Sequence, residues 1–359
     1  MKFKFAMVCS FVVILLCGCG GQDNASSAKL SGQVGAMNAP AASSHFAASR
    51  FLEQATMGPS PAMQAQVKAQ GIDAWIASQM KMTPTKIITP ESMVNYDDQR
   101  DKPAADRMRD FYNLNLFNLF IGGEDQLRIR TSWVLSNFLV VSTRKVAEYG
   151  GLEYLNMLQT HAFSQYGDLL KSLTISPAMG FYLDNSQNTK SQLNENYGRE
   201  LMQLFSVGLV QLNMDGTPKR DASGKVLETY TQKDVIEITR ALTGWRFVPN
   251  PTDLISNRNF ANYGKPMIEN SGRHDTDSKT FLGKTIPAGQ TAAKDLDSVV
   301  DILVTHPNTA PFVSLRLIQG MTTSDPSPAY LQRVATVFKE TKGNLAKIVV
   351  AILTDPEAR

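Results

Sequence analysis

Residues 161–208 read HAFSQYGDLLKSLTISPAMGFYLDNSQNTKSQLNENYGRELMQLFSVG, and towards the end of this stretch apolar residues recur every three or four positions. That spacing is typical of one helix face, whereas a half-buried strand would alternate apolar and polar residues. Asn194 is a residue type that caps helix N-termini well, so a helix is expected over 195–207. Its apolar face carries Tyr197, Leu201, Leu204, Phe205 and Gly208. We expect this face to pack into a core.

The same spacing continues through most of the chain from residue 45 onward, which predicts a mainly α, multi-helix domain over 45–359. One excursion interrupts it near 209–231, where Val210 and Leu212 precede Asp215-Gly216 and predict a small β-hairpin. Further helices are expected at 46–55, 61–69, 72–80, 104–120, 124–141, 149–163, 166–173, 177–183, 232–243, 293–305, 307–319, 328–339 and 344–353.

The N-terminus has the composition of an export signal. All three cysteines lie in the first nineteen residues, and Cys19 ends the string Leu16-Cys17-Gly18-Cys19 after a basic start and a short apolar run. These are the parts of a secretory signal peptide, and the ending resembles a bacterial lipobox. We expect a lipoprotein signal peptide at 1–18 and a lipid on Cys19. An uncut anchor or an ordinary signal peptide are the alternatives, although the run is shorter than the ~20 apolar residues of a spanning helix.

Residues 19–44 are expected to be a flexible tether, because Gly, Ser, Ala, Asn and Gln dominate and few large apolar side chains occur. Gly20 and Gly21 follow the cysteine and no Asp stands next to it. By the sorting rule of enterobacterial lipoproteins, this favours the outer membrane. The predicted location is the bacterial cell envelope, with the membrane as a partner through the lipid on Cys19.

Cysteine use and charge exclude several classes of function. Once Cys19 is lipidated and the signal peptide is removed, no thiol remains for a disulfide, a thiolate metal site or a cysteine nucleophile. The formal net charge of +3 includes Lys2 and Lys4, so the mature domain is nearly neutral. Nucleic-acid binding is therefore not expected.

Glu200 is the first candidate catalytic residue, because it lies at the edge of the apolar face of the predicted 195–207 helix. A carboxylate in such a place needs a partner. One interpretation makes Glu200 a general acid/base or metal ligand on which His161 or His274 converges. The other makes it a structural carboxylate bound to Arg240, Arg130 or backbone amides, and we favour this second interpretation.

The irregular stretch 249–290 contains Gly272-Arg273-His274-Asp275, and Lys279 follows shortly after. Long loops on a rigid scaffold often carry function, so His274 and Asp275 are candidates for exposed chemistry. His161 remains open as a core, surface or ligand residue. His306, just before Pro307, is interpreted as structural. The cofactor is left open. A divalent metal is one candidate, although no standard metal or nucleotide motif occurs in the sequence.

A second set of polar residues surrounds the start of the 195–207 helix, and we treat it as a candidate binding set. Glu195 and Arg199 are four residues apart, in the order that favours an ion pair on the solvated face. Asp184, with Asn194, could coordinate a cation, but such residues at helix ends are ordinarily turn formers. Trp245 after Gly244 could be a ligand platform and is more often a core residue. The candidate set is Asp184, Asn194, Glu195, Asn196, Arg199 and Trp245.

The chain resembles the bacterial domain of unknown function 1800 (DUF1800) family. The resemblance rests on residues 161–208 and on the blocks RFLEQATMGPS (50–60), RIRTSWVLSNFLVVS (128–142), YTQKDVIEITRALTGW (230–245) and HDTDSKTFLG (274–283). The family name assigns no chemistry. Members are typically exported and often encoded beside a sulfatase-like or alkaline-phosphatase-like exported protein of the domain of unknown function 1501 family, which implies a partner of that kind.

The sequence departs from common family patterns at two places. Gln203 and Phe205 replace a carboxylate and an imidazole of many members, and Leu135-Ser136-Asn137-Phe138 stands where many members have an aromatic-Asn-His-Phe pattern. A metal site using those histidines is therefore not expected. Family members commonly continue well past LTDPEAR, so we interpret the domain as incomplete at its C-terminus.

Two functional hypotheses follow. The preferred one is a non-catalytic helical lipoprotein that binds or scaffolds an exported partner, of the sulfatase-like kind. The alternative is a cell-envelope hydrolase or metal-assisted enzyme that uses Glu200 with His161, His274 and Asp275. The enzyme requires that these groups converge in one pocket.

Overall fold

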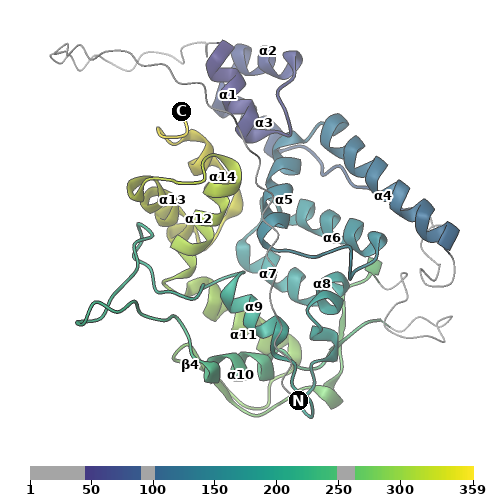
Figure 1. Cartoon of the computed structure of the whole chain (residues 1–359), viewed down its shortest axis with the longest axis vertical. Helices are drawn as coiled ribbons and strands as arrows, with labels where there is room; N and C mark the ends of the chain where they lie inside the picture. The colour runs from purple at the N-terminus through teal and green to yellow at the C-terminus, as the bar shows by residue number, and fades with distance from the viewer. Residues whose placement is uncertain (1–44, 90–101, 249–262) are drawn as a thin grey trace, which may run out of the picture. The chain divides into compact units, whose positions relative to one another are not determined.

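The computed structural model describes residues 45–89, 102–248 and 263–359, which belong to one compact unit spanning 40–359 (Figure 1). The predicted signal peptide, Cys19 and the tether lie outside the described residues, as does 249–262 of the irregular stretch. Among the described helices, none combines the length and the apolar character needed to cross a membrane.

The mainly α fold class is confirmed, since the described residues form fourteen α-helices and only short strands. The helices are α1 (His45–Ala55), α2 (Pro61–Gln70), α3 (Ile72–Met80), α4 (Lys102–Gly122), α5 (Gln126–Phe138), α6 (Glu148–His161), α7 (Tyr166–Ile175), α8 (Pro177–Tyr182), α9 (Glu195–Gln203), α10 (Gln232–Ala241), α11 (Ala292–Thr305), α12 (Thr309–Met321), α13 (Pro328–Thr341) and α14 (Leu345–Thr354). The strands are β1 (Trp245–Arg246), β2 (Ile268–Glu269), β3 (Lys279–Phe281) and β4 (Lys284–Ile286), with single turns of 3-10 helix at η2 (Asn185–Gln187) and η4 (Ser271–Arg273).

The helices begin where capping chemistry allows. Ser60 caps α2 by accepting a hydrogen bond from the Met63 amide, and Pro61 follows at the first helical position. Thr231 and Asp234 form a reciprocal capping box at the start of α10. Each predicted helix is present, with ends that differ by a few residues.

One continuous apolar core joins the elements. The α2 helix packs against α1 and α3, and α5 contacts α1, α3, α6 and α12 (Figure 1). The C-terminal helices α12, α13 and α14 pack on one another, while α10 contacts α9, β3 and α11. The strands form two antiparallel pairs, β1 with β2 and β3 with β4.

The α9 helix is shorter than the sequence predicts. It ends at Gln203, because the amides of Phe205 and Gly208 bond to carbonyls five and six residues back instead of four. Ser206 also donates to the carbonyl of Leu201 and removes it from the helical ladder. Leu204, expected on the core face, is therefore 42% exposed, whereas Tyr197, Leu201 and Phe205 are buried as predicted.

The excursion at 209–231 contains no extended strand in the structure. Its backbone forms isolated antiparallel bridges that pair three short segments. The amide of Gln211 donates to Leu227, that of Leu227 to Lys219, and that of Lys219 to Gln211, which closes a ring of three hydrogen bonds. Asp215 and Asp221 accept from nearby amides at the two turns. We call this segment the arm (residues 209–229); it leaves the helices between α9 and α10 (Figure 1).

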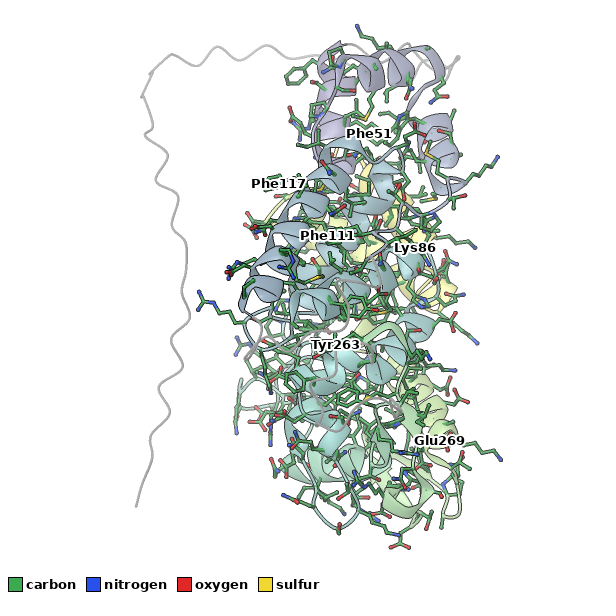
Figure 2. All side chains as sticks on the ribbon, turned by 90° about the vertical axis from the view of Figure 1, so that its right-hand side faces the viewer. Phe51, Lys86, Phe111, Phe117, Tyr263 and Glu269 are labelled. Carbon is green, nitrogen blue, oxygen red and sulfur yellow. The ribbon has the colours of Figure 1, made fainter. Side chains whose placement is uncertain are left out.

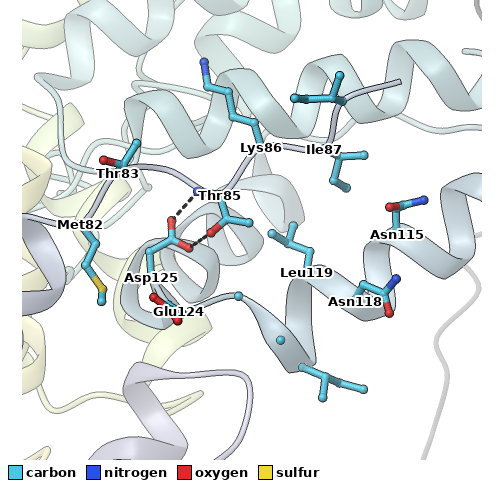
Figure 3. Close-up of a pocket in the computed structure, with 14 residues that line it drawn as sticks. Met82, Thr83, Thr85, Lys86, Ile87, Asn115, Asn118, Leu119, Glu124 and Asp125 are labelled. Carbon is cyan, nitrogen blue, oxygen red and sulfur yellow. Dashed lines mark hydrogen bonds between the residues drawn. The ribbon is translucent and has the colours of Figure 1, made fainter. Parts of the chain in front are cut away.

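Residues 82–89 run as an extended segment held by side chains of two helices. Thr85 donates its amide to Asp125, 3.0 Å away, and the Ile87 amide donates to Oδ1 of Asn156 at 3.1 Å. The Asn156 amide group donates back to the Ile87 carbonyl at 2.9 Å, as a neighbouring strand would. We call this segment the strap (residues 82–89), and Figure 3 shows its contact with Asp125.

Candidate functional site

His274 lies in the interior, which corrects the expectation that it performs exposed chemistry. Its Nδ1 is 2.9 Å from the carbonyl oxygen of Thr243, and because a carbonyl only accepts, Nδ1 donates. Its Nε2 lies 3.3 Å from Oδ2 of Asp295. The chain turns tightly here at Gly244, which has a φ of +89°. A Cβ atom at this position would lie only 2.9 Å from the Cβ of His274, so glycine is required.

Lys279 is buried with His274 and pairs with Asp295. Its Nζ lies 2.5 Å from Oδ2 of Asp295, and both side chains are 0% exposed. The same ammonium donates to the backbone carbonyl of Asp275. Sequence reasoning missed Asp295, because an Asp in the first turn of a helix is common on electrostatic grounds alone. We call His274, Lys279 and Asp295 the buried charge cluster.

Asp275 belongs to a separate ion pair. Nε of Arg240 lies 2.8 Å from its Oδ2, and Nη1 of Arg240 lies 3.0 Å from Oε1 of Glu237. Burial alone would raise the pKa of Asp275, but the hydrogen bonds from Arg240 and from the Asp277 amide lower it below its ordinary value. Arg240 is therefore occupied and is not the partner of Glu200 that the structural interpretation named.

Glu200 has a buried Oε2 with no hydrogen-bond partner among the described residues. Arg130, its other expected partner, donates to the carbonyl of Gly320 instead. Burial raises the pKa of Glu200, and the charge of Arg199 opposes that shift. The hydroxyl of Tyr230 is also buried without a partner, and its pKa is raised by burial and by the charge of Glu200. Glu200 is thus a partly buried carboxylate in which one oxygen, Oε2, has no hydrogen bond.

Replacing Glu200 with glutamine is expected to stabilise the protein at pH 7 by about 1 kcal/mol, because the charged form lacks a partner. A raised pKa means that the folded state holds the proton above the ordinary value of 4.5. The penalty is absent below that pH and complete above the folded-state pKa. Urea unfolding at pH 4 and pH 7 should show the gain growing with pH. The exposed Glu228→Gln variant is the control, and a less stable Glu200→Gln protein would contradict this account.

Asp184 and Asn196 meet, but not as a cation site with Asn194. Nδ2 of Asn196 donates to Oδ2 of Asp184 at 3.1 Å, and Nζ of Lys145 lies 2.9 Å from Oδ1. Asn194 caps α9, as predicted, by accepting from the Asn196 amide. The Asp184 carboxylate therefore already has a cationic partner within the protein.

The predicted pair of Glu195 and Arg199 is confirmed, with Oε2 and Nη2 2.7 Å apart. Both side chains also bond to Gln232 at the start of α10. Trp245 is buried, as the core interpretation of this residue requires, and its Nε1 has no hydrogen-bond partner among the described residues. This part of the binding set holds α9 against α10.

His161 lines a cavity of about 300 Å³ between α6, the corner of α7 and α8, and residues 263–266. Its Nδ1 is buried without a partner, and burial lowers its pKa. Glu153 lines the same cavity, and its pKa is raised by burial while Lys86 opposes the shift. Eight residues along a helix correspond to about 12 Å of rise, so Glu153 and His161 lie about two turns apart along α6.

The four catalytic candidates have different neighbours among the described residues and do not form one site. His161 faces its own cavity, Glu200 is near Arg199 and Tyr230, His274 belongs to the buried charge cluster, and Asp275 pairs with Arg240. Among the described residues, no group of three His, Cys, Asp or Glu side chains is placed to hold a metal ion.

An open groove of about 940 Å³ runs between the strap and the second half of α4 (Figure 3). Ile88 of the strap and Ile121 of α4 line it and are 84% and 82% exposed. Leu114 and Phe117 lie seven and four residues before Ile121 and are 61% and 65% exposed; Figure 2 labels Phe117. Spacings of three and four place these side chains on one helix face. We call Leu114, Phe117 and Ile121 the apolar stripe, which sequence reasoning missed.

Comparison with known proteins gives one match. A family model described as "Protein of unknown function (DUF1800)" matches residues 50–359. Neither a curated protein nor a solved structure matches the chain.

Proposed function

The chain belongs to the DUF1800 family of proteins of unknown function, and on that premise we propose that it is an exported, lipid-anchored protein that binds a second exported protein. The lipid is on Cys19, and the anchoring membrane is the outer membrane. The partner is a sulfatase-like protein of the domain of unknown function 1501 family. The observation that carries the proposal is the apolar stripe beside the open groove.

Exposure of the apolar stripe to water is energetically unfavourable. Soluble monomers rarely expose contiguous apolar surface without a function for it, and aromatic residues are enriched at the centres of protein interfaces. Phe117 stands in the middle of the stripe, and Ile88 of the strap is exposed at the groove that Ile121 also lines. A partner helix or loop would bury these side chains together.

The charges around the stripe favour a protein partner over a lipid surface. Helices that lie on membranes carry Lys or Arg along their polar face, whereas the basic residues of α4 (Lys102, Arg107 and Arg109) all precede the stripe and residues 110–122 contain none. The polar residues that alternate with the stripe are instead Asn113, Asn115 and Asn118. An apolar centre with an uncharged polar rim is typical of protein interfaces.

The candidate polar residues support binding rather than the alternative enzyme. His274 lies buried beside Asp295 and Lys279, and Asp275 pairs with Arg240, so each is engaged with other residues of the protein. A hydrolase built on Glu200, His161 and His274 would need them to reach one substrate, and each has different neighbours among the described residues.

The test is binding of the detergent-solubilised full chain to a purified sulfatase-like protein of the domain of unknown function 1501 family, measured by biolayer interferometry. The Phe117→Ser/Ile121→Ser variant should bind about 30-fold more weakly, since truncating a central interface residue costs about 2 kcal/mol. Phe46→Ser is the matched control, because Phe46 is exposed on α1 away from the stripe. Equal binding by the double variant, or binding of lipid vesicles through the stripe instead, would overturn the proposal.

A further inference from the structure

A second cavity, of about 390 Å³, is lined by basic groups from three parts of the chain. Lys219 comes from the arm, His306 from the corner between α11 and α12, and Lys339 and Lys342 from the end of α13. No aspartate or glutamate lines this cavity. The charges of the three lysines are therefore not neutralised within it.

Lys219, Lys339 and Lys342 form no ion pair with another described residue. Lys219 is close enough to His306 that its charge, after burial, lowers the pKa of that imidazole. Like charges repel when no counter-charge stands between them. Lys339 and Lys342 are exposed and hydrated in the free protein, and an anion that enters the cavity would meet all three cations without a competing carboxylate.

Backbone hydrogen bonds within the arm fix the position of Lys219. Its amide donates to Gln211 at 2.7 Å and its carbonyl accepts from Leu227 at 3.0 Å, within the ring that closes the arm. Asn308 ties the arm to the helices by accepting from the Leu212 amide and donating to the carbonyls of Val207 and Val210. The fold thus brings an arm lysine to the end of α13.

His306 presents a hydrogen-bond donor to this set. Its Nδ1 accepts from the Asn308 amide at 3.2 Å. A neutral imidazole has one donor and one acceptor nitrogen, so Nε2 carries the proton. Three ammonium groups and one N–H are all donors, which suits the oxygens of a tetrahedral oxyanion.

The preference for cations at a helix C-terminus explains only some of the basic residues that line this cavity. Cations are favoured at helix C-termini, which accounts for Lys339 and Lys342 separately. It does not account for Lys219 or His306, which come from other segments. Lys342 also has a left-handed φ of +53°, where glycine or asparagine is preferred. This sequence has a lysine there despite that backbone preference.

We infer that this cavity binds a small organic phosphate or sulfate ester, with the oxyanion held by Lys219, His306, Lys339 and Lys342. Lysine ammonium groups bind phosphate as point charges. The volume is within the range of small-molecule pockets, about 300–1,000 Å³, and exceeds what a bare oxyanion fills. Leu212, Met214 and Val304 supply apolar wall for the organic part.

The test is titration calorimetry of the full chain with inorganic phosphate, inorganic sulfate, glucose 6-phosphate, glucose 6-sulfate and glucose at constant ionic strength. The esters should bind more tightly than the free ions, and the stronger of the two esters identifies the oxyanion. Lys219→Met and Lys342→Gly should each weaken ester binding at least tenfold. Lys347→Met, an exposed lysine outside the cavity, should leave it unchanged.

A second readout separates this proposal from general charge attraction. Lys219→Met should unfold at the same or a higher temperature than the wild type without ligand, because a repulsion is removed, and it should lose the thermal shift that the ester gives the wild type. The inference is overturned if no probe produces heat or a thermal shift in the wild type, or if Lys347→Met loses as much binding as Lys219→Met.

Discussion

Replacing Asp295 with alanine is expected to lower the free energy of unfolding by about 3–5 kcal/mol, because it leaves a buried lysine without its counter-charge. Lys279 and Asp295 are both 0% exposed, and His274 lies 3.3 Å from the same carboxylate oxygen. Water cannot solvate the ammonium in place of the lost carboxylate without opening the core. The measurement is urea unfolding at pH 7, followed by circular dichroism.

The same helix offers a matched control for this prediction. Asp297, two residues further along α11, pairs with Lys171 at the surface, with side chains 63% and 40% exposed. Asp297→Ala should cost less than about 1 kcal/mol, the usual value for an exposed ion pair. The Lys279→Met/Asp295→Leu variant should recover most of the stability, since replacing both partners by apolar residues is often neutral. Equal losses for Asp295→Ala and Asp297→Ala would contradict the assignment of a buried pair.

The helices were predictable because their signals are local. Asn194, Ser60 with Pro61, and the spacing of Tyr197, Leu201 and Phe205 act within one or two turns, and the structure confirms each. The end of α9 was not predictable. Gly208 is the residue type that indicates a helix end, but the backbone hydrogen bonds leave the helical spacing several residues before it. The spacing of apolar residues does not indicate which carbonyl oxygen each backbone amide bonds to.

The buried charge cluster could not be predicted because its members belong to a loop, a strand and a helix start, and the sequence pattern does not show how these pack together. His274, Lys279 and Asp295 resemble loop and helix-start residues when considered separately. Only the closure of the chain at Gly244 and the packing of β3 near α10 place them inside. The expectation of exposed chemistry at His274 was wrong for this reason.

The anion-binding candidate and the apolar stripe show two further limits. Lys219 and Lys342 are more than a hundred residues apart, so the sequence gives no sign that they share a cavity. The stripe does have a sequence signal, the spacing of Leu114, Phe117 and Ile121. Periodicity alone does not distinguish a face that packs internally from one left in solvent.

Replacing Asn308 with alanine is expected to cost about 3 kcal/mol of stability and to loosen the arm. Its side chain is 2% exposed and makes three hydrogen bonds, to the carbonyls of Val207 and Val210 and from the amide of Leu212. Each unsatisfied buried group costs about 1–3 kcal/mol, and some of the three will find water. The sequence placed the next helix start at Pro307; α12 instead begins at Thr309, after Asn308.

Hydrogen exchange distinguishes a loosened arm from general destabilisation. The amides of Gln211, Lys219 and Leu227, which close the ring of the arm, should exchange faster in Asn308→Ala than the lost global stability alone predicts. Asn213→Ala removes only an exposed bond to Thr217 and should change stability by less than about 0.5 kcal/mol. Because Leu212 and Lys219 both line the basic cavity, a loosened arm should also weaken binding of the phosphate or sulfate ester. Protection of the ring amides equal to that of the wild type would show that the arm does not depend on Asn308.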